Sequence, residues 1–281
     1  MSIHFIADII KGIKPCLPAG RPGRLDKIEL IMIISVVNQK GGVGKTTTVI
    51  NLAAALSALG KRILLIDLDP QGNSSSGFGI EDRSKGIYEI LSEQISWQDG
   101  LRQIKENLFV IPANQNLAGA NIELVNLPDR ERFLAKVLNN FSTAFDYIFI
   151  DNPPSLGLLT VNSLVAADKV LVPVQAEYYA LEGLGQLLST VELIKQNLQP
   201  NLGILGAVVT MYDDKLDLAR EVWHELYKNF PYKIFRTVIP RDVKLAEAPS
   251  FGKNILEYAP KSKSAKAYQR LAREFLDYHN R

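Results

Sequence analysis

Cysteine is almost absent from this chain, because Cys16 is the only one among 281 residues. A single thiol excludes a disulfide framework, a zinc site of four cysteines and any cluster held by several thiolates of this chain. Long apolar runs are missing too, since no stretch approaches the roughly 18 residues of a membrane span. The N-terminus also lacks the pattern of a secretory signal. We therefore expect a cytoplasmic protein.

Charge is nearly balanced over the whole chain but uneven along it. The formal net charge is +2. Residues 32–194 contain 12 Lys and Arg against 17 Asp and Glu, whereas residues 195–281 contain 15 against 10, a net charge of +5. A basic C-terminal third on an otherwise acidic chain permits a polyanion-binding face. An ordinary solvated surface is the alternative.

Residues 1–31 differ in composition from the rest, because the stretch from Lys14 to Arg24 is rich in Pro and Gly. We expect a disordered N-terminal extension, with the folded domain over residues 32–281. The extension contains no pair of helices typical of an operator-binding domain, so we expect no sequence-specific operator binding. The alternative is a short amphipathic anchor whose apolar face holds Ile3, Ile6, Ile10 and Ile13.

From Met32 onward, apolar β-branched runs alternate with longer helical segments, which is typical of a parallel sheet covered on both faces. The expected strands are Ile33 to Val37, Arg62 to Ile66, Leu108 to Ile111, Tyr147 to Ile150, Lys169 to Val174 and Ile204 to Thr210. The expected helices are 45–59, 129–140, 156–167, 181–197, 216–229 and 264–279. We predict a single α/β domain of the P-loop NTPase class, with a mostly parallel twisted sheet flanked by helices on both faces.

A glycine-rich loop follows the first expected strand and leads directly into a helix. Its residues are Lys40, Gly41, Gly42, Val43, Gly44, Lys45, Thr46 and Thr47. Glycines let several backbone N–H groups face one phosphate, and the helix N-terminus adds partial positive charge. Lys45 is then expected to reach the β- and γ-phosphates of a nucleotide, with the Thr46 hydroxyl on Mg²⁺. The loop is a variant, because Gln39 stands where the standard pattern has Gly and Lys40 adds a second lysine.

Acidic residues end two other apolar runs. Asp67 and Asp69 follow the second expected strand, and Asp151 follows the fourth. Carboxylates at the ends of strands beside a phosphate loop can hold a metal's water shell or orient an attacking water. Taken singly, each Asp is more often a helix cap or a turn residue. Together with the loop, they predict a Mg²⁺–nucleotide site.

These motifs resemble the ParA/Soj family of chromosome- and plasmid-partitioning ATPases, which have a deviant Walker A loop. The resemblance runs from Met32 to near the C-terminus. It covers KGGVGKTTT at 40–48, DLDPQGN at 67–73, DNPPS at 151–155, VPVQAEYYALEGL at 172–184, VTMYD at 209–213 and VIPRDVKLAEAPSFGK at 238–253. The last three blocks have no meaning in a generic P-loop, so the resemblance depends chiefly on them.

The resemblance implies a role for each matching residue. Lys40 would be the signature lysine that reaches across an ATP-sandwiched dimer, beside the Walker lysine Lys45, and Asp69 would be catalytic by orienting water. For Mg²⁺, Thr46 would bind the ion directly while Asp67 and Asp151 support its hydration shell. The adenine would lie near Met211 and the segment from Pro240 to Asp242.

The sequence departs from the family's pattern at three positions, one of which is Asp242. The family usually has Asn where this chain has Asp242, and commonly a smaller residue where it has Asn152. The base contact at position 242 is therefore in question. Relatives often place an arginine for DNA near the position of Glu192, so the resemblance allows a shifted DNA face.

The resemblance also implies a reaction cycle. ATP binding makes a homodimer, the dimer binds double-stranded DNA without sequence preference, and a ParB-type centromere-binding partner stimulates hydrolysis, which is slow without it. The protein would be associated with the nucleoid. The basic residues expected to form the DNA face are Arg241, Lys244, Lys253, Lys261, Lys263 and Arg270.

Three other classes of function are alternatives for a chain with this loop. The runner-up is a MinD-like membrane ATPase, which needs a C-terminal amphipathic helix with a free apolar face. The last expected helix has an apolar stripe, but we expect it to pack on the sheet. A metabolic P-loop enzyme similar to dethiobiotin synthetase would turn over a small acceptor molecule without DNA. A pure binding module would show no ATP turnover, and Asp69 and the loop argue against it. The stripe consists of Tyr268, Leu271, Ala272, Phe275 and Leu276.

Overall fold

The computed structural model describes residues 31–139, 145–177 and 180–279. The expected disordered extension and its alternative, the anchor with Ile3, Ile6, Ile10 and Ile13, therefore lie outside the described residues, apart from Ile31. The remaining expectations about the fold fall almost entirely within them.

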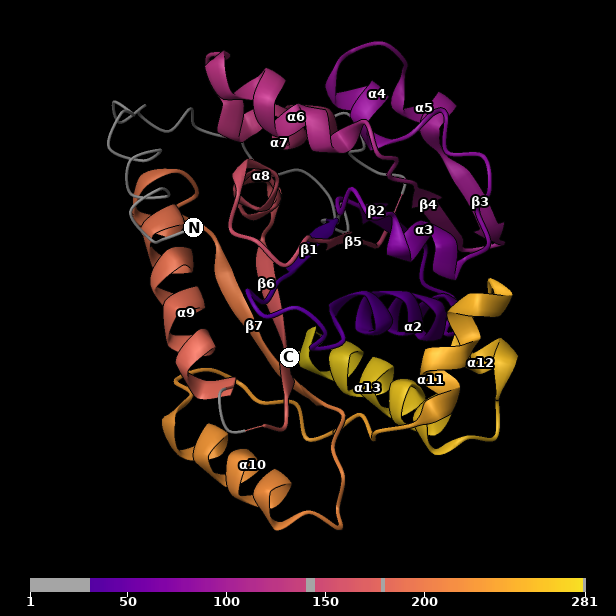
Figure 1. Ribbon diagram of the computed structural model, residues 1–281, viewed down its shortest axis with the longest axis vertical. Helices are drawn as coiled ribbons and strands as arrows, with labels where there is room; N and C mark the ends of the chain where they lie inside the picture. The colour runs from indigo at the N-terminus through magenta and orange to yellow at the C-terminus, as the bar shows by residue number, and fades with distance from the viewer. Residues whose placement is uncertain (1–30, 140–144, 178–179, 280–281) are drawn as a thin grey trace, which may run out of the picture.

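A twisted sheet runs through the middle of the molecule (Figure 1). Among the described residues it has seven strands in the order β3-β4-β2-β5-β1-β6-β7. Neighbouring strands are parallel except for the antiparallel pair β3 and β4 at one edge. The strands are β1 Met32–Val36, β2 Ile63–Asp67, β3 Arg102–Lys105, β4 Leu108–Ile111, β5 Tyr147–Asp151, β6 Lys169–Gln175 and β7 Gly203–Thr210.

The helices form two layers on the sheet (Figure 1). One layer contains α2, α12 and α13, and the other contains α6, α7, α8 and α9. The predicted mostly parallel sheet with helices on both faces is confirmed. The α-helices are α2 Lys45–Ala58, α3 Asn73–Gly77, α4 Ile87–Leu91, α5 Trp97–Gly100, α6 Leu117–Glu123, α7 Phe133–Leu138, α8 Leu158–Ala166, α9 Ala180–Asn197, α10 Asp217–Asn229, α11 Val243–Glu247, α12 Ile255–Tyr258 and α13 Lys263–His279.

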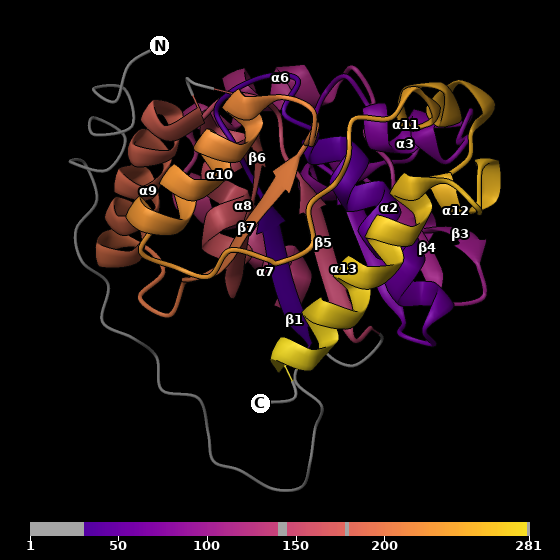
Figure 2. The ribbon, with the colours of Figure 1, turned by 90° about the horizontal axis from the view of Figure 1, so that it is seen from below.

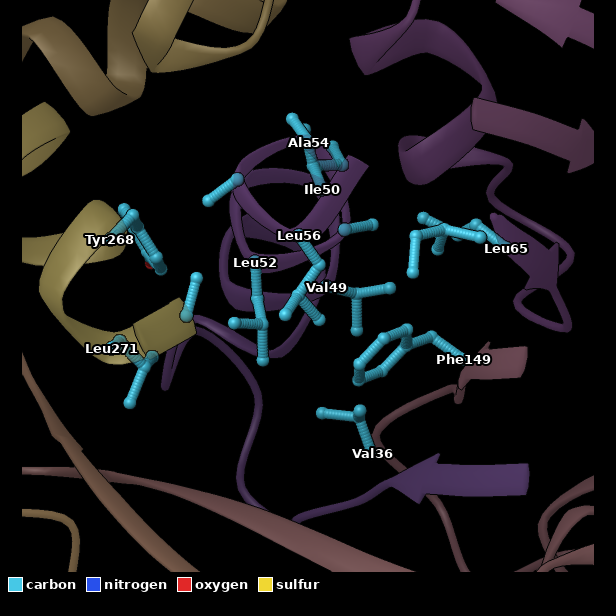
Figure 3. Packing of buried hydrophobic residues seen from close by; sticks show 14 of the residues in the cluster. Val36, Val49, Ile50, Leu52, Ala54, Leu56, Leu65, Phe149, Tyr268 and Leu271 are labelled. Carbon is cyan, nitrogen blue, oxygen red and sulfur yellow. The ribbon is translucent and has the colours of Figure 1, made fainter. Parts of the chain in front are cut away.

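Helix α2 lies between the sheet and α13, and both of its sides are apolar (Figure 3). On one side Val49 and Leu56 approach Phe149 of β5, and on the other Leu52 approaches Leu271 of α13. All five of these side chains are at most 1% exposed. Because burying such a side chain is worth roughly 1.5–3 kcal/mol, this layer contributes much of the stability of the fold.

The apolar stripe of α13 is buried in this layer. Tyr268, Leu271, Ala272 and Phe275 are each at most 1% exposed, and Leu276 packs against the same cluster. The prediction that the stripe packs on the sheet is confirmed at Phe275, whose ring lies 5.1 Å from that of Tyr147 and 5.9 Å from that of Phe149, both in β5. Across the described ranges, no helix is long and apolar enough to cross a membrane.

The parallel strands bring the carboxyl ends of β1, β2, β5, β6 and β7 to one edge of the sheet, and the arrows of β1 and β7 point toward that edge in Figure 2. Strand β1 lies between β5 and β6, and the glycine-rich loop follows β1 at this edge. Register pairs Asp67 directly with Asp151. In parallel sheets, ligands bind outside the carboxyl ends of the strands, where the order of strands reverses.

Candidate active site

The glycine-rich loop is fixed between β1 and α2 by its own backbone and by two neighbouring strands. Gly42 and Gly44 have φ angles of 74° and 86°, which favour glycine over residues with a Cβ. The Asn38 side chain donates to the carbonyl of Pro173 at 2.8 Å. The Thr210 hydroxyl donates to the carbonyl of Val43 at 2.7 Å. The loop is thereby tied to β6 and to β7.

Lys45 begins α2 and is only 7% exposed. Its Nζ atom donates to the carbonyl of Lys40 at 3.1 Å. Burial lowers the pKa of Lys45, while the nearby carboxylates of Asp151 and Asp69 raise it. Because the first turn of α2 contains no acidic residue, the helix N-terminus and this ammonium present positive charge at the same place.

Asp67 and Asp151 end neighbouring strands and are fully buried. Helix α3 supplies hydrogen bonds to both carboxylates. Ser75 donates to Asp67 Oδ2 through its backbone N–H at 2.8 Å and through its hydroxyl at 2.7 Å. Ser74 donates to Asp151 Oδ2 at 2.7 Å. The two carboxylates are therefore held in place from one short helix.

The carboxylates of Asp67 and Asp151 are buried side by side, so each disfavours the charged form of the other. Burial raises the pKa of Asp67 and that of Asp151, and Asp67 raises the pKa of Asp151 further. The hydrogen bonds from Ser75 and Ser74 oppose these rises, as does the hydroxyl of Thr46 near Asp151. A nearby cation would favour the charged form of both groups.

These residues fit a magnesium ion. The Oδ1 atom of Asp151 is buried and makes no hydrogen bond of standard geometry, although the Thr46 hydroxyl lies close to that carboxylate. In the described part of the chain, no three His, Cys, Asp or Glu side chains are placed so that they could together hold a metal ion. A magnesium ion here would take Thr46 as its direct ligand and its other ligands from water and phosphate, as Mg²⁺ commonly does in nucleotide sites.

Asp69 lies just beyond the end of β2 and is 7% exposed. Its backbone N–H donates to Asp67 Oδ1 at 3.2 Å, and its own Oδ1 accepts from the N–H of Gln71 at 3.0 Å. If the strand continued through residue 69, Asp67 and Asp69 would point the same way, because side chains of a strand alternate between its two faces. The strand ends at Asp67, so this alternation does not apply, and Asp69 belongs instead to the turn that leads into α3.

The segment predicted to hold adenine is assembled beside β7. Met211 follows that strand with a left-handed φ of 51°. Tyr212 donates its N–H to the carbonyl of Ile239 at 2.9 Å, and Arg241 donates its N–H to the carbonyl of Tyr212 at 3.0 Å. Pro240 pairs with Tyr212 in the same bridge. Met211 and Pro240 are thus brought together from distant parts of the chain.

Asp242 has structural partners on both carboxylate oxygens. Oδ1 accepts from the N–H of Lys244 at 3.1 Å and caps α11. Oδ2 accepts from the hydroxyl of Ser264 at 2.6 Å, at the start of α13. The carboxylate therefore joins α11 to α13, and its contact with a base stays a prediction.

Asn152, the other departure from the family's pattern, also has a structural role. Its Nδ2 atom donates to the Ser35 hydroxyl at 3.1 Å and to the carbonyls of Val36 and Ile150 at 3.0 and 3.1 Å. Ser35 in turn shares a 2.7 Å hydrogen bond with Ser163 of α8. The amide thus clamps the ends of β1 and β5 on the side of the sheet that faces α8.

Sequence reasoning missed one residue at the rim of the site, Glu177. Its Oε2 atom accepts from Lys40 Nζ at 3.0 Å. Its Oε1 atom accepts from Gln175 Nε2 at 2.5 Å and lies 3.9 Å from Arg241 Nη2. The only signal was its place after β6, within the block from Val172 to Leu184 that resembles the ParA/Soj family.

The six cations predicted to contact DNA are all exposed. Arg241 lies beside Glu177 at the nucleotide site, whereas Lys244 lies on α11 and Arg270 on α13. Glu192 is exposed on α9, where its Oε1 accepts from Gln196 at 2.9 Å. The remaining members of the set, Lys253, Lys261 and Lys263, lie before or at the start of α12 and α13.

Comparison with known proteins identifies the family of the chain. Residues 31–204 match the family model described as an AAA domain. The sporulation initiation inhibitor protein Soj of Bacillus subtilis is 52% identical over 245 residues, which are 86% of this chain and 97% of that protein. The chain belongs to the Soj/ParA family of chromosome-partitioning ATPases. The ParA protein of Myxococcus xanthus is 49% identical over 87% of each chain.

Solved structures similar to this Soj/ParA chain include nucleotide complexes. A cobyrinic acid a,c-diamide synthase of Mycobacterium smegmatis with bound ADP and magnesium has a TM-score of 0.79 and 36% identity, covering 89% of this chain and 96% of that one. A plasmid partition protein of Borrelia burgdorferi bound to AMPPNP has a TM-score of 0.75 and 26% identity, covering 88% and 99%. The expected P-loop fold and the resemblance to ParA/Soj are confirmed.

Proposed function

We propose that this chain binds and hydrolyses ATP with Mg²⁺ to drive DNA partition. The observation that carries the proposal is the contrast between its two loop lysines. Lys45 is buried beside the carboxylates, whereas the Lys40 side chain is 41% exposed at the rim. A lysine at the rim can reach a nucleotide held by a second subunit, so ATP can join two copies of the chain.

Each residue of the site has a place in the reaction. Lys45 and the loop N–H groups bind the β- and γ-phosphates. Mg²⁺, when bound at Thr46, supplies positive charge to the phosphate oxygens. Asp67 and Asp151 would support the hydration shell of that ion, and Asp69 would orient the attacking water. Hydrolysis is slow in one subunit, because Lys40 has to come from the other one.

DNA binding follows from dimerisation. Two copies double the basic C-terminal third, which has a net charge of +5 in each chain. Contacts with phosphates then become cooperative in ATP and sensitive to salt. DNA binding keeps the protein on the nucleoid while ATP is bound. A ParB-type partner stimulates hydrolysis and so releases the dimer from DNA.

Retention of a random DNA duplex with ATP, ADP or no nucleotide, at several salt concentrations, tests this function. We expect strong, salt-sensitive retention with ATP only. No retention in any state, together with ATP-dependent attachment to anionic liposomes, would support the MinD-like alternative instead. The buried stripe of α13 argues against that alternative, because the residues that would enter a membrane are already packed on α2.

The role of Lys40 has its own test. Lys40→Ala should abolish the turnover that a ParB-type partner stimulates, whereas binding of ADP to the single subunit should persist because Lys45 is intact. Normal stimulated turnover in this variant would show that the second lysine does not serve the reaction.

A further inference from the structure

The rim of the nucleotide site contains a small charge cluster centred on Glu177. One carboxylate oxygen pairs with Lys40 Nζ at 3.0 Å. The other accepts from Gln175 at 2.5 Å and lies 3.9 Å from Arg241. Glu177 therefore stands between the phosphate loop and the segment beside β7, and it has a partner on each side.

This cluster places Lys40 in a contact within its own subunit. In the dimer, the same ammonium would have to meet the phosphates of the nucleotide in the other subunit. A carboxylate and a polyphosphate compete for one ammonium, so Lys40 has to leave Glu177 when the dimer forms. Glu177 would not be left alone, because Gln175 still donates to it and Arg241 lies within reach.

We propose that Glu177 is a positioning residue that holds Lys40 on its own subunit, and that ATP-dependent dimerisation transfers Lys40 from Glu177 to the nucleotide of the neighbouring copy. This inference rests on the proposed function, in which Lys40 acts across a dimer. Arg241 is the alternative partner of Glu177. The cluster therefore has two arrangements, with Glu177 paired to Lys40 in the single subunit and to Arg241 in the dimer.

The exposure of the cluster sets the size of its effect. The side chains of Lys40 and Glu177 are 41% and 43% exposed, and that of Arg241 is 61% exposed. Exposed ion pairs are weak, and their loss changes an equilibrium constant by about two- to fivefold. Such a contact biases dimerisation without preventing it, as a reversible ATP-driven cycle requires.

The test measures the dissociation constant of the dimer by analytical ultracentrifugation with a non-hydrolysable ATP analogue and Mg²⁺, without DNA. Glu177→Gln should lower that constant by about two- to fivefold, because Lys40 is no longer held. Arg241→Gln should raise it, because Glu177 then keeps only Lys40 as a cationic partner. The matched control is Glu106→Gln in the turn between β3 and β4, at the opposite edge of the sheet, and it should change nothing.

A second step separates the ion pair from a general field effect. Removing the charge of Glu177 also makes the site more positive toward ATP. This effect would persist in a Lys40→Gln background, measured at the higher protein concentration that a dimer without its cross-subunit lysine requires, whereas release of the ion pair would not. We therefore expect Glu177→Gln to leave the dimer constant unchanged once Lys40 has been replaced, as a double-mutant cycle requires of a direct pair.

Two kinds of failure are distinguishable. If the wild type does not dimerise with the ATP analogue, the proposed function and this inference are both overturned. If the wild type dimerises but Glu177→Gln leaves the constant unchanged, raises it, or lowers it equally without Lys40, only the inference is overturned. Binding of ADP to the single subunit, measured for each variant, shows that the fold of the site is intact.

Discussion

Lys40 and Lys45 lie five positions apart in one loop but have opposite surroundings. Lys45 is buried among carboxylates, and Lys40 is paired at the surface. The roles expected for Lys45 and Thr46 could be derived from sequence, because a phosphate loop is a local pattern between one strand and one helix. Glu177 could not, because it is 137 positions from Lys40 and meets it only in the folded chain.

Asp69 can be tested by removing its carboxylate. Asp69→Ala should reduce ATP turnover by about a hundredfold or more, the lower range for a group that acts on the attacking water. It should also trap an ATP-bound dimer on DNA, because binding does not need the carboxylate. Turnover is measured by phosphate release, with Asp217→Ala on the exposed start of α10 as the control. Normal hydrolysis in Asp69→Ala would refute the catalytic assignment.

Asp67 predicts a pH dependence of stability. Burial raises its pKa from 3.8 to about 6, so between these values the folded chain binds more protons than the unfolded chain. This group's contribution is therefore fully present below pH 4 and is lost as the pH rises through 6. Asp67→Asn removes this pH-dependent loss of stability. The variant also loses hydrogen bonds, which changes the free energy of unfolding by an amount that does not depend on pH.

The measurement is urea unfolding of both proteins without nucleotide or metal, from pH 4 to pH 7. The difference in unfolding free energy should move in favour of Asp67→Asn by roughly 1–3 kcal/mol over this range. A difference that stays constant with pH would mean that Asp67 is charged in the folded chain throughout.

At the scale of elements, the apolar segments could be predicted, including the four residues of β4, and the short polar ones could not. Strand β3 was not predicted, because its residues, Arg102 to Lys105, alternate between half-buried and exposed and contain no apolar run. Helix α3 has five residues, too few for a helical period, and yet its Ser74 and Ser75 hold both buried carboxylates. Periodicity detects elements that bury a face, and α3 is held by hydrogen bonds instead.

Helix α13 gives a prediction about packing. Leu271 is 1% exposed against α2, so Leu271→Ala should lower the free energy of unfolding by about 2–5 kcal/mol. Gln269→Ala, on the exposed side of the same helix, should change it by less than about 0.5 kcal/mol. Equal, small effects for both variants, measured by chemical denaturation, would mean that the stripe does not pack on the fold.

At the scale of the whole molecule, the cations of the C-terminal third predict how DNA binding responds to salt. Replacing Lys261, Lys263 and Arg270 with Gln removes six cations from the dimer, so it should flatten the slope of log affinity against log salt by up to about 5.4, or roughly 0.9 for each phosphate that is no longer neutralised. A matched triple, Lys215, Arg220 and Lys228 on or before α10, removes the same charges from another surface.

Equal changes in both triples, measured on a random duplex with ATP, would show that only net charge matters. A change confined to the first triple would place the DNA face at the start and middle of α13. The sequence predicted the basic third from composition alone, but which cations share a surface depends on how α11, α12 and α13 fold against α2.

The packing of α13 on α2 has a consequence for synthesis of the chain. Helix α2 leaves the ribosome early, but α13, which covers Leu52, comes much later in the chain. Until α13 has been made, that side of α2 has no native cover and is a site where chaperones can bind or nascent chains can aggregate. This layer of the fold therefore cannot be completed before α13 has left the ribosome.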